Sequence, residues 1–285
     1  KLDLEEFHKI LDFFSSDLRM QAYLMIALES IARPQELLYR KIRDIEHKKP
    51  NYAIITLSDH GKEGTGILQC IDAYPFLMRW LEKHPFKNDP NAYIFVNTGN
   101  KKMGAQMTPV NINKRLETAC KILKIPKHIT CYSLKRNGVT FRRLRGDTDM
   151  EIQHAARWTS AKQLKTYDMS TQNDALQLQL IKKGLIPPDK IKAQHKHAMP
   201  KNIDCPSCGK VNPFNALKCN NCECVLHNRD IMKAEKAQKK KFSDMQEQIA
   251  SMKEQLEVRK PYEAMMEKLL KNEQVQEIVK AELSQ

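Results

Sequence analysis

The sequence predicts a mainly α-helical domain with a small β-hairpin, followed by a short cysteine-rich module and a helical C-terminal tail. Apolar residues recur at three- and four-residue intervals through most of the first 186 residues, which is the period of an amphipathic helix. Five of the eight Cys crowd into residues 205–224, beyond a stretch rich in Pro and Lys. We therefore expect a helical domain over 1–186, a basic linker over 187–202, a compact module over 203–226 and a helical tail over 228–285.

The first elements follow from the spacing of apolar residues. A helix is predicted where such residues repeat at intervals of three and four: Leu4, Phe7, Ile10, Leu11 and Phe14. A more fully apolar helix ends near residues 32–34, and Pro34 begins the next, because proline suits the first turn of a helix. Residues 52–57 and 66–71 are rich in strand-forming residues and flank a turn-prone segment, so they predict the hairpin.

The remaining elements are helices. They are expected around residues 76–83, 111–123, 133–145, 150–157 and 160–183. In the tail, apolar residues occupy heptad a and d positions: Phe242, Met245, Ile249, Met252 and Leu256. This pattern covers about two heptads before Pro261, fewer than a coiled coil needs, so self-association through the tail stays open.

The charge balance favours a polyanionic partner. Lys and Arg number 48 against 34 Asp and Glu, a formal net charge of +14, which makes nucleic acid the leading candidate. No apolar run approaches the roughly 20 residues that a membrane span needs, so we expect a soluble protein with no membrane partner. The chain starts at Lys1 and not at Met, so the sequence leaves open what precedes it.

The cysteine-rich module predicts a metal site. Cys205, Cys208, Cys219 and Cys222 form two Cys-x-x-Cys pairs separated by ten residues, a spacing that allows four thiolates to close tetrahedrally on Zn²⁺. Four protein ligands leave no open coordination position, so this zinc ribbon is expected to be structural. Disulfide-linked or unbridged cysteines are the alternative. Cys224 and His227 lie outside the paired pattern, and Cys224 is interpreted as a spare thiol.

Several reactive side chains lie at the boundaries of the predicted elements. Arg33 follows an apolar helix, Lys62 lies at the hairpin tip, and Trp158 precedes Tyr167 by nine positions. Tyr132 and Lys135 open a predicted helix. Taken singly, each has an ordinary explanation as a surface cation or a packed aromatic residue. Their order along one domain is more specific than any one of them.

That order resembles the catalytic domain of the tyrosine recombinases, the phage and archaeal integrase family, over roughly residues 2–186. Arg33-Pro-Gln-Glu-Leu resembles the family's Arg-x-x-Glu-Leu helix start, and Lys62 its hairpin lysine. Trp158 matches the His/Trp site and Tyr167 the nucleophile. Residues 132–135 occupy the His-x-x-Arg box, with Tyr132 in place of His and Lys135 in place of Arg. The zinc ribbon resembles the C-terminal extension of archaeal integrases.

The resemblance implies a site-specific recombinase or integrase acting on double-stranded DNA, through a Holliday junction in a homotetramer on paired sites. Arg33, Tyr132 and Lys135 would hold the phosphate oxygens, and Trp158 would offer its indole N–H. Tyr167 would form a 3′-phosphotyrosyl intermediate, and Lys62 would protonate the departing 5′-oxygen. No metal is implied for catalysis. A prokaryotic cytoplasmic location, associated with the nucleoid on binding DNA, follows from the same resemblance.

The substitution at Lys135 keeps the alternatives open. An ammonium group is a point charge and cannot make the bidentate fork of a guanidinium group, and the adjacent Arg136 projects about 100° away around the helix. One alternative is a catalytically impaired relative that binds DNA in a structural or regulatory role, and another is a relaxing enzyme of the type IB topoisomerase kind. Basic residues near the proposed site are expected to contact DNA: Arg136, Arg142, Arg143, Arg145, Arg157 and Lys162.

Overall fold

The computed structural model describes residues 1–58, 65–99, 102–186, 201–226, 261 and 265–266. The chain divides into a compact unit, Lys1–Leu226, and a second unit, His227–Gln285. Lys62, most of the predicted linker, His227 and the heptad positions of the tail lie outside the described residues, so the predictions made for them remain predictions.

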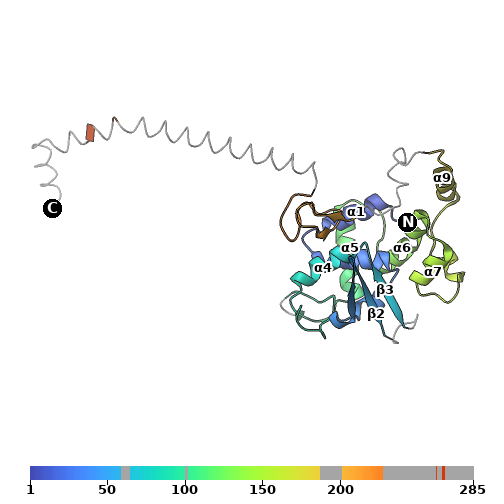
Figure 1. Ribbon diagram of the computed structural model, residues 1–285, viewed down its shortest axis with the longest axis horizontal. Coiled ribbons are helices and arrows are strands. Elements are labelled where there is room, and N and C mark those ends of the chain that lie inside the picture. The colour runs from blue at the N-terminus through green and yellow to red at the C-terminus, as the bar shows by residue number, and fades with distance from the viewer. Residues whose placement is uncertain (59–64, 100–101, 187–200, 227–260, 262–264, 267–285) are drawn as a thin grey trace, which may run out of the picture. The chain divides into compact units, whose positions relative to one another are not determined.

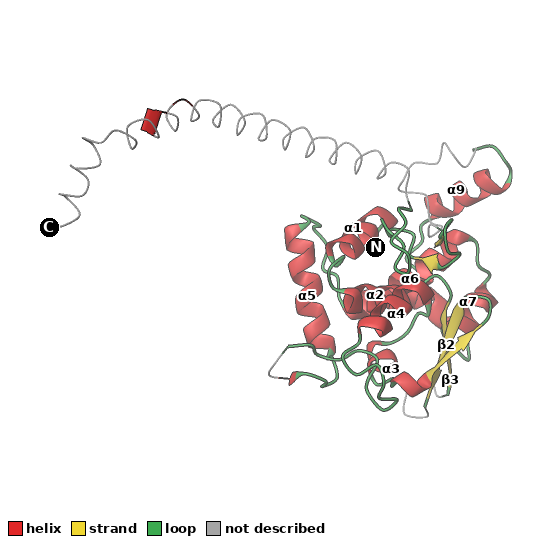
Figure 2. Ribbon diagram, turned by 60° about the vertical axis from the view of Figure 1, so that its left-hand side comes forward, coloured by secondary structure: helices red, strands yellow, loops and turns green. Residues whose placement is uncertain are grey.

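Helix α2 (Leu18–Glu29) is the central element of the first unit. Ten of its twelve residues are buried, and it contacts the helices α4 and α6 as well as strand β3. Figure 1 shows the unit coloured along the chain, and Figure 2 shows α2 among the other long helices. These are α1 (Leu4–Phe13), α4 (Tyr74–Lys83), α5 (Pro109–Ile122) and α6 (Cys131–Arg145). The predicted helices in this part of the chain are therefore confirmed.

The predicted hairpin is part of a three-stranded antiparallel sheet in the order β1-β2-β3. The strands are β1 (Ile45–Lys48), β2 (Tyr52–Leu57) and β3 (Gly66–Cys70). Ile55 of the central strand is buried and lies opposite Ile45 and Leu68. The sequence did not predict β1, because this edge strand is short and mostly polar and so lacks the alternating apolar pattern.

The predicted single helix over residues 160–183 is wrong. The structure has two helices there, α8 (Lys162–Tyr167) and α9 (Gln172–Lys182). Thr171 and Asp174 form a capping box that starts α9, and the Asp168 carboxylate accepts the N–H of Ser170 in the intervening turn. The break places Tyr167 at the end of α8.

Short helices complete the unit. They are α3 (Pro34–Leu38), the 3₁₀ turn η1 (Ile42–Asp44) and α7 (Asp149–Ala155). A small apolar cluster that includes Ile31, Val139 and Trp158 packs against Tyr167, beside the larger core. The mainly helical fold with a small sheet agrees with the sequence prediction. Among the described residues, no helix is both long and apolar enough to cross a bilayer.

Candidate active site and metal site

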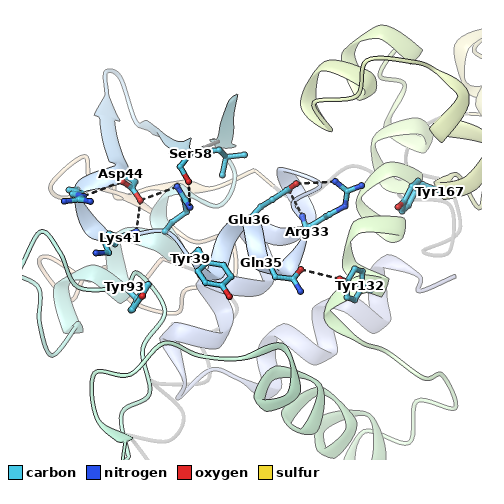
Figure 3. Close-up of a pocket in the computed structure, with 13 residues that line it drawn as sticks. Arg33, Gln35, Glu36, Tyr39, Lys41, Asp44, Ser58, Tyr93, Tyr132 and Tyr167 are labelled. Atoms are coloured by element: carbon cyan, nitrogen blue, oxygen red, sulfur yellow. Dashed lines mark hydrogen bonds and ion pairs between the residues drawn. The ribbon is translucent and has the colours of Figure 1, made fainter. Parts of the chain in front are cut away.

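Arg33 is fixed in direction by the first turn of α3. It precedes the helix in an extended conformation (φ −72°, ψ 149°), and Pro34 begins the helix. The Glu36 carboxylate accepts the Arg33 backbone N–H at 2.8 Å and pairs with its guanidinium Nη1 at 3.5 Å. The Glu36 side chain is 4% exposed, whereas that of Arg33 is 21% exposed. Figure 3 shows Arg33 between Glu36 and Tyr167.

Tyr132 lies beside α3 because α6 begins there. Thr130 caps α6 by accepting the backbone N–H of Ser133, so Tyr132 falls in the first turn. Its side chain is exposed, and its hydroxyl donates to Oε1 of Gln35 at 3.3 Å (Figure 3). Tyr132 of α6 thus contacts the helix that follows Arg33.

Lys135, Trp158 and Tyr167 form a stacked group in the interior. The rings of Trp158 and Tyr167 lie 5.2 Å apart with an interplanar angle of 32°. The Lys135 Nζ lies 5.5 Å from the Trp158 ring centroid and 5.3 Å from that of Tyr167, within cation–π range. Lys135 is only 1% exposed, so it does not present its charge to solvent as an open phosphate contact would. The Trp158 indole N–H has no hydrogen-bond acceptor among the described residues.

A cavity of about 1120 Å³ brings Arg33, Tyr132 and Tyr167 together. Its walls carry four basic and two acidic side chains, which favours an anionic ligand. Several lining residues were not predicted from the sequence: Gln35, Tyr39, Arg40, Lys41, Arg43 and Tyr93. The run Tyr39-Arg-Lys-Ile-Arg, which mixes aromatic and basic residues directly after α3, is the signal that could have identified most of them.

Arg40 connects this cavity to the strand that leads toward Lys62. Its guanidinium donates to the Ser58 hydroxyl at 3.0 Å and to the Thr56 carbonyl at 3.4 Å. Asp44 pairs with it at 3.7 Å. Ser58 is the last described residue before the segment that contains Lys62, so Arg40 anchors the end of β2 beside the cavity.

Two of the arginines expected to contact DNA point into the protein. Arg142 donates to the Glu29 carbonyl at 3.3 Å and to the Gln69 side chain at 3.0 Å. The Arg157 side chain is 7% exposed and pairs with Glu36. Both arginines were predicted to be open to DNA, but both side chains are largely buried. Neighbouring carbonyl and carboxylate oxygens accept their hydrogen bonds inside the protein, and an amphipathic sequence pattern does not reveal such acceptors.

The other basic residues of that set keep more exposure. Arg143 pairs with Asp168 at 3.2 Å and also with Asp149, and Arg145 pairs with Asp147 at 2.8 Å. Arg136 and Lys162 are exposed on α6 and α8. These two are the members of the set whose charges are most accessible to a large polyanion.

The four predicted cysteine ligands converge. The Sγ atoms of Cys205, Cys208, Cys219 and Cys222 all lie within 4.8 Å of one another, and Cys224 is not part of the cluster. The two Cys-x-x-Cys turns have the same geometry: the Gly209 N–H donates to the Cys205 carbonyl, and the Glu223 N–H donates to the Cys219 carbonyl. Gly209 and Glu223 both adopt positive φ, 70° and 58°. Strands β4 (Ile203–Asp204) and β5 (Val211–Asn212) flank the first turn.

The donor set fits a tetrahedral Zn²⁺ ion. Burial raises the pKa of Cys219, but the backbone N–H groups of Cys222 and Asn221 and the amide of Asn212 outweigh it and lower that pKa to about 6. The Cys224 N–H lowers the pKa of Cys222, yet the neighbouring thiols of the cluster raise it to about 12. Four thiols this close repel one another once they ionise, and a bound cation relieves that repulsion.

The cysteine module packs against the helical domain through one aromatic side chain and a polar rim. Phe214 lies edge-on to Phe76 of α4, with ring centroids 5.7 Å apart, and 5.1 Å from the ring of His8 on α1. Lys210 pairs with Glu82 at 2.7 Å, and the Asn215 amide donates to Asp12 at 2.8 Å. None of these residues lines the cavity around Arg33.

The fold, a helical domain with a small antiparallel sheet, is that of a tyrosine recombinase catalytic domain. The profile described as the Phage integrase family matches residues 1–174, and the chain belongs to that family. A comparison with curated proteins finds no match.

Solved structures share the fold at low sequence identity. XerA recombinase superimposes with a TM-score of 0.54 at 20% identity, covering 64% of this chain and 62% of that one. XerH site-specific recombinase bound to its palindromic difH substrate gives 0.50 at 20% identity, covering 64% and 52%. The Tn1549 transposon integrase in complex with circular intermediate DNA gives 0.50 at 15% identity, covering 64% and 66%.

Proposed function

We propose that the chain is the catalytic part of a site-specific DNA recombinase that cleaves and rejoins DNA through a covalent bond to Tyr167. The observation that carries the proposal is the shared cavity: Tyr167 and Arg33, which come from distant parts of the sequence, both line it. Its basic excess suits a phosphodiester, and membership of the Phage integrase family supports the same chemistry.

In the proposed reaction, the phenolic oxygen of Tyr167 attacks the scissile phosphorus in line. The Tyr–O–P bond forms as the P–O5′ bond breaks. The phenol releases its proton to water, and the 5′-oxygen leaves with a proton that we assign to Lys62. Extra negative charge develops on the nonbridging oxygens in the transition state, where Arg33 stabilises it more than in the ground state. The product is a 3′-phosphotyrosyl enzyme and a free 5′-hydroxyl.

Reversal of this step rejoins the strands. A 5′-hydroxyl from another duplex can attack the phosphotyrosine and release Tyr167 without an external energy source, because the phosphodiester bond energy is kept in the enzyme–DNA bond. Strand exchange between paired sites in a tetramer is the proposed use of that reversibility. The chain's residues supply the charge that the step needs, so the zinc of the cysteine cluster is assigned a structural role.

Lys135 and Trp158 are assigned supporting roles. Trp158 stacks on the Tyr167 ring, and the Lys135 ammonium lies 5.3 Å from its centroid, so both support the phenol in its present position. Movement of the Tyr167 ring toward the phosphate would uncover the indole N–H and the ammonium group, and both could then donate to a phosphate oxygen. Tyr132, exposed beside Gln35, is placed to donate its hydroxyl to the same phosphate.

The test uses nicked DNA duplexes with randomised sequence around the nick. Cleavage close to the nick releases a short fragment with a 5′-hydroxyl, which diffuses away and traps the covalent adduct. We expect an adduct that survives denaturing electrophoresis, and its DNA can be sequenced to identify the site.

Tyr167 and Tyr132, two of the four tyrosines that line the cavity, provide matched variants. Tyr167→Phe should abolish the adduct, whereas Tyr132→Phe should still form one. An adduct in Tyr167→Phe would contradict the assignment of the nucleophile. Tight DNA binding with no adduct from any duplex would instead favour the non-catalytic DNA-binding relative.

A further inference from the structure

The Arg157 side chain joins three acceptors in the interior. Its guanidinium donates to Oε2 of Glu36 at 2.8 Å, to the Ser30 carbonyl at 3.2 Å and to the Ala155 carbonyl at 2.8 Å. With a side chain 7% exposed, it cannot serve as an open contact for DNA. Arg157 therefore links the end of α7 to the turn between α2 and α3, where Arg33 lies.

The backbone at both ends of this link has an unusual conformation. Ile31 and Arg157 adopt positive φ values of 53° and 59°. A β-branched residue such as Ile31 is rarely found there, and such strain persists only where surrounding contacts enforce it. The Ser30 carbonyl that Arg157 binds immediately precedes Ile31, so the guanidinium holds the strained turn that leads into Arg33.

Glu36 connects Arg157 to Arg33, because its carboxylate contacts both arginines. Glu36 is buried and accepts from Arg157 while it also contacts the backbone and guanidinium of Arg33. A buried carboxylate needs a cationic partner. With Arg157 in place, Glu36 is shared between two cations, and Arg33 keeps its place in the cavity wall while it pairs with Glu36. Without Arg157, Glu36 would draw the Arg33 guanidinium toward itself.

The absence of a side chain at Gly66 leaves room for the Arg157 side chain. A Cβ at Gly66 would lie 2.9 Å from Cδ and 3.3 Å from Cγ of Arg157. The guanidinium is held by three acceptors, so the side chain cannot move aside without losing some of them. Gly66 is the first residue of β3, so Arg157 packs against the start of this strand.

We propose that Arg157 is a positioning residue that neutralises Glu36 and so keeps Arg33 directed into the cavity. The expected effect of Arg157 on DNA cleavage rests on the proposed recombinase function. Its expected effect on the α2–α3 turn is independent of that function and can be measured in the free protein.

The variants separate this role from general stability. Arg157→Gly removes the side chain but suits the positive φ, and Arg157→Lys keeps the charge without the three-way geometry. Gly66→Ala leaves Arg157 in the chain but crowds it. Glu36→Gln, added to Arg157→Gly, removes the negative charge that would capture Arg33. Arg115→Ala, which breaks an ion pair with Asp17 away from the cavity, is the matched control.

The first measurement is amide hydrogen exchange of α3 in the free protein. The N–H groups of Leu37 and Tyr39, bonded to the carbonyls of Arg33 and Gln35, should lose protection in Arg157→Gly and Gly66→Ala but not in Arg115→Ala. Unchanged exchange in both variants would overturn the positioning role, whatever the protein does to DNA. If Arg157→Gly does not fold, Gly66→Ala carries this comparison.

The second measurement is the rate of adduct formation on nicked duplex at saturating DNA. Arg157→Gly should react about a hundredfold more slowly while its affinity for intact duplex stays within about twofold, because a small displacement of a catalytic group costs this much. Adding Glu36→Gln should recover at least part of the rate, which a purely structural role would not allow. A wild-type rate in Arg157→Gly, or no recovery in the double variant, would overturn the charge-neutralisation argument. If the wild-type protein forms no adduct, the proposed function fails, and the exchange data still decide the positioning role.

Discussion

At the scale of single residues, Lys135 is buried and its ammonium group lies over two aromatic rings. The ammonium lies about equally far from the ring centroids of Trp158 and Tyr167, 5.5 and 5.3 Å. Lys135→Met keeps an unbranched side chain of similar length and removes the charge, so we expect a folded protein. We also expect adduct formation to fall about a hundredfold, the usual cost of losing one transition-state donor.

Adduct yield on nicked duplex and thermal unfolding measure the two effects of Lys135→Met. A wild-type rate of adduct formation in the folded variant would mean that Lys135 only packs against the rings.

The exposed and buried cations near the cavity should differ in the salt dependence of DNA binding. Arg136 is exposed, whereas Arg142 is bonded to Glu29 and Gln69. Neutralising one phosphate contributes about −0.9 to the slope of log affinity against log salt. Arg136→Ala and Lys162→Ala should each reduce the slope by about one, and Arg142→Ala should leave it unchanged. Titrations of intact duplex at four salt concentrations measure these slopes, and a reduced slope in Arg142→Ala would contradict its assignment as an interior residue.

The sequence predicted three of the residues that line the cavity, but not most of the other lining residues and not which side chains are buried. Arg33, Tyr132 and Tyr167 were identified because their order and context match a family pattern, and all three line the cavity. The burial of Arg157 could not be predicted, because helical periodicity says nothing about a glutamate 121 positions earlier in the chain. Such long-range acceptors become visible only in the fold.

At the scale of elements, α2 and α6 cross at a glycine. A Cβ at Gly138 would lie 2.3 Å from the Leu28 carbonyl oxygen, so the helices cannot keep their separation with any larger residue. Gly138→Ala should lower the free energy of unfolding by about 3 kcal/mol, because the clash outweighs the gain in helix propensity. Chemical denaturation measures this cost, and Gly99→Ala, where a Cβ meets nothing within 4 Å, is the control. A neutral Gly138→Ala would contradict the close approach.

The position of α9 depends on a carboxylate whose pKa is low. Burial raises the pKa of Asp174, but hydrogen bonds from Lys1 and Thr171 outweigh it and lower the pKa to about 2, below its ordinary value of 3.8. A depressed pKa means that the ionised form stabilises the fold above the unfolded pKa and that this contribution is lost as pH falls through the folded one.

The stability difference between the wild-type protein and Asp174→Asn should therefore shrink between about pH 4 and pH 2. Denaturation of both proteins across this range measures the difference. A difference that does not change with pH would show that Asp174 contributes through its capping geometry and not through its charge.

Sequence periodicity predicted the long helices better than the boundaries between short elements. Leu4, Phe7, Ile10, Leu11 and Phe14 are all buried, as their spacing indicates. The division of residues 160–183 into α8 and α9 was missed because the polar residues that cap α9 are also common on exposed helix surfaces. That division ends a helix at Tyr167, the proposed nucleophile.

At the scale of the whole molecule, the cysteine module is part of the same compact unit as the helical domain. The spacing of its cysteines predicted the metal site, but nothing in the sequence indicated where the module docks. The contact is made by Phe214, one aromatic residue in a polar segment, together with the ion pair between Lys210 and Glu82 of α4. A metal bound by the four cysteines would thereby be coupled to the packing of α1 and α4, because we expect the module to hold Phe214 in place only when it is folded.

Removal of the metal should consequently weaken the helical domain without stopping the chemistry. Chelation unfolds a module of this size, since its apolar core is too small to fold alone. Phe214→Ala should lower the free energy of unfolding by roughly 1–2 kcal/mol in the metal-loaded protein, and Leu217→Ala, which truncates an exposed side chain of the same module, should have little effect. A chelator should lower the stability of the wild-type protein more than that of Phe214→Ala, because the variant has already lost the docking contact. Thermal unfolding with and without chelator measures this coupling.

Because the docking residues lie outside the cavity, adduct formation at saturating DNA should continue after chelation. Loss of adduct formation in a folded protein would mean that the module contributes to the active site.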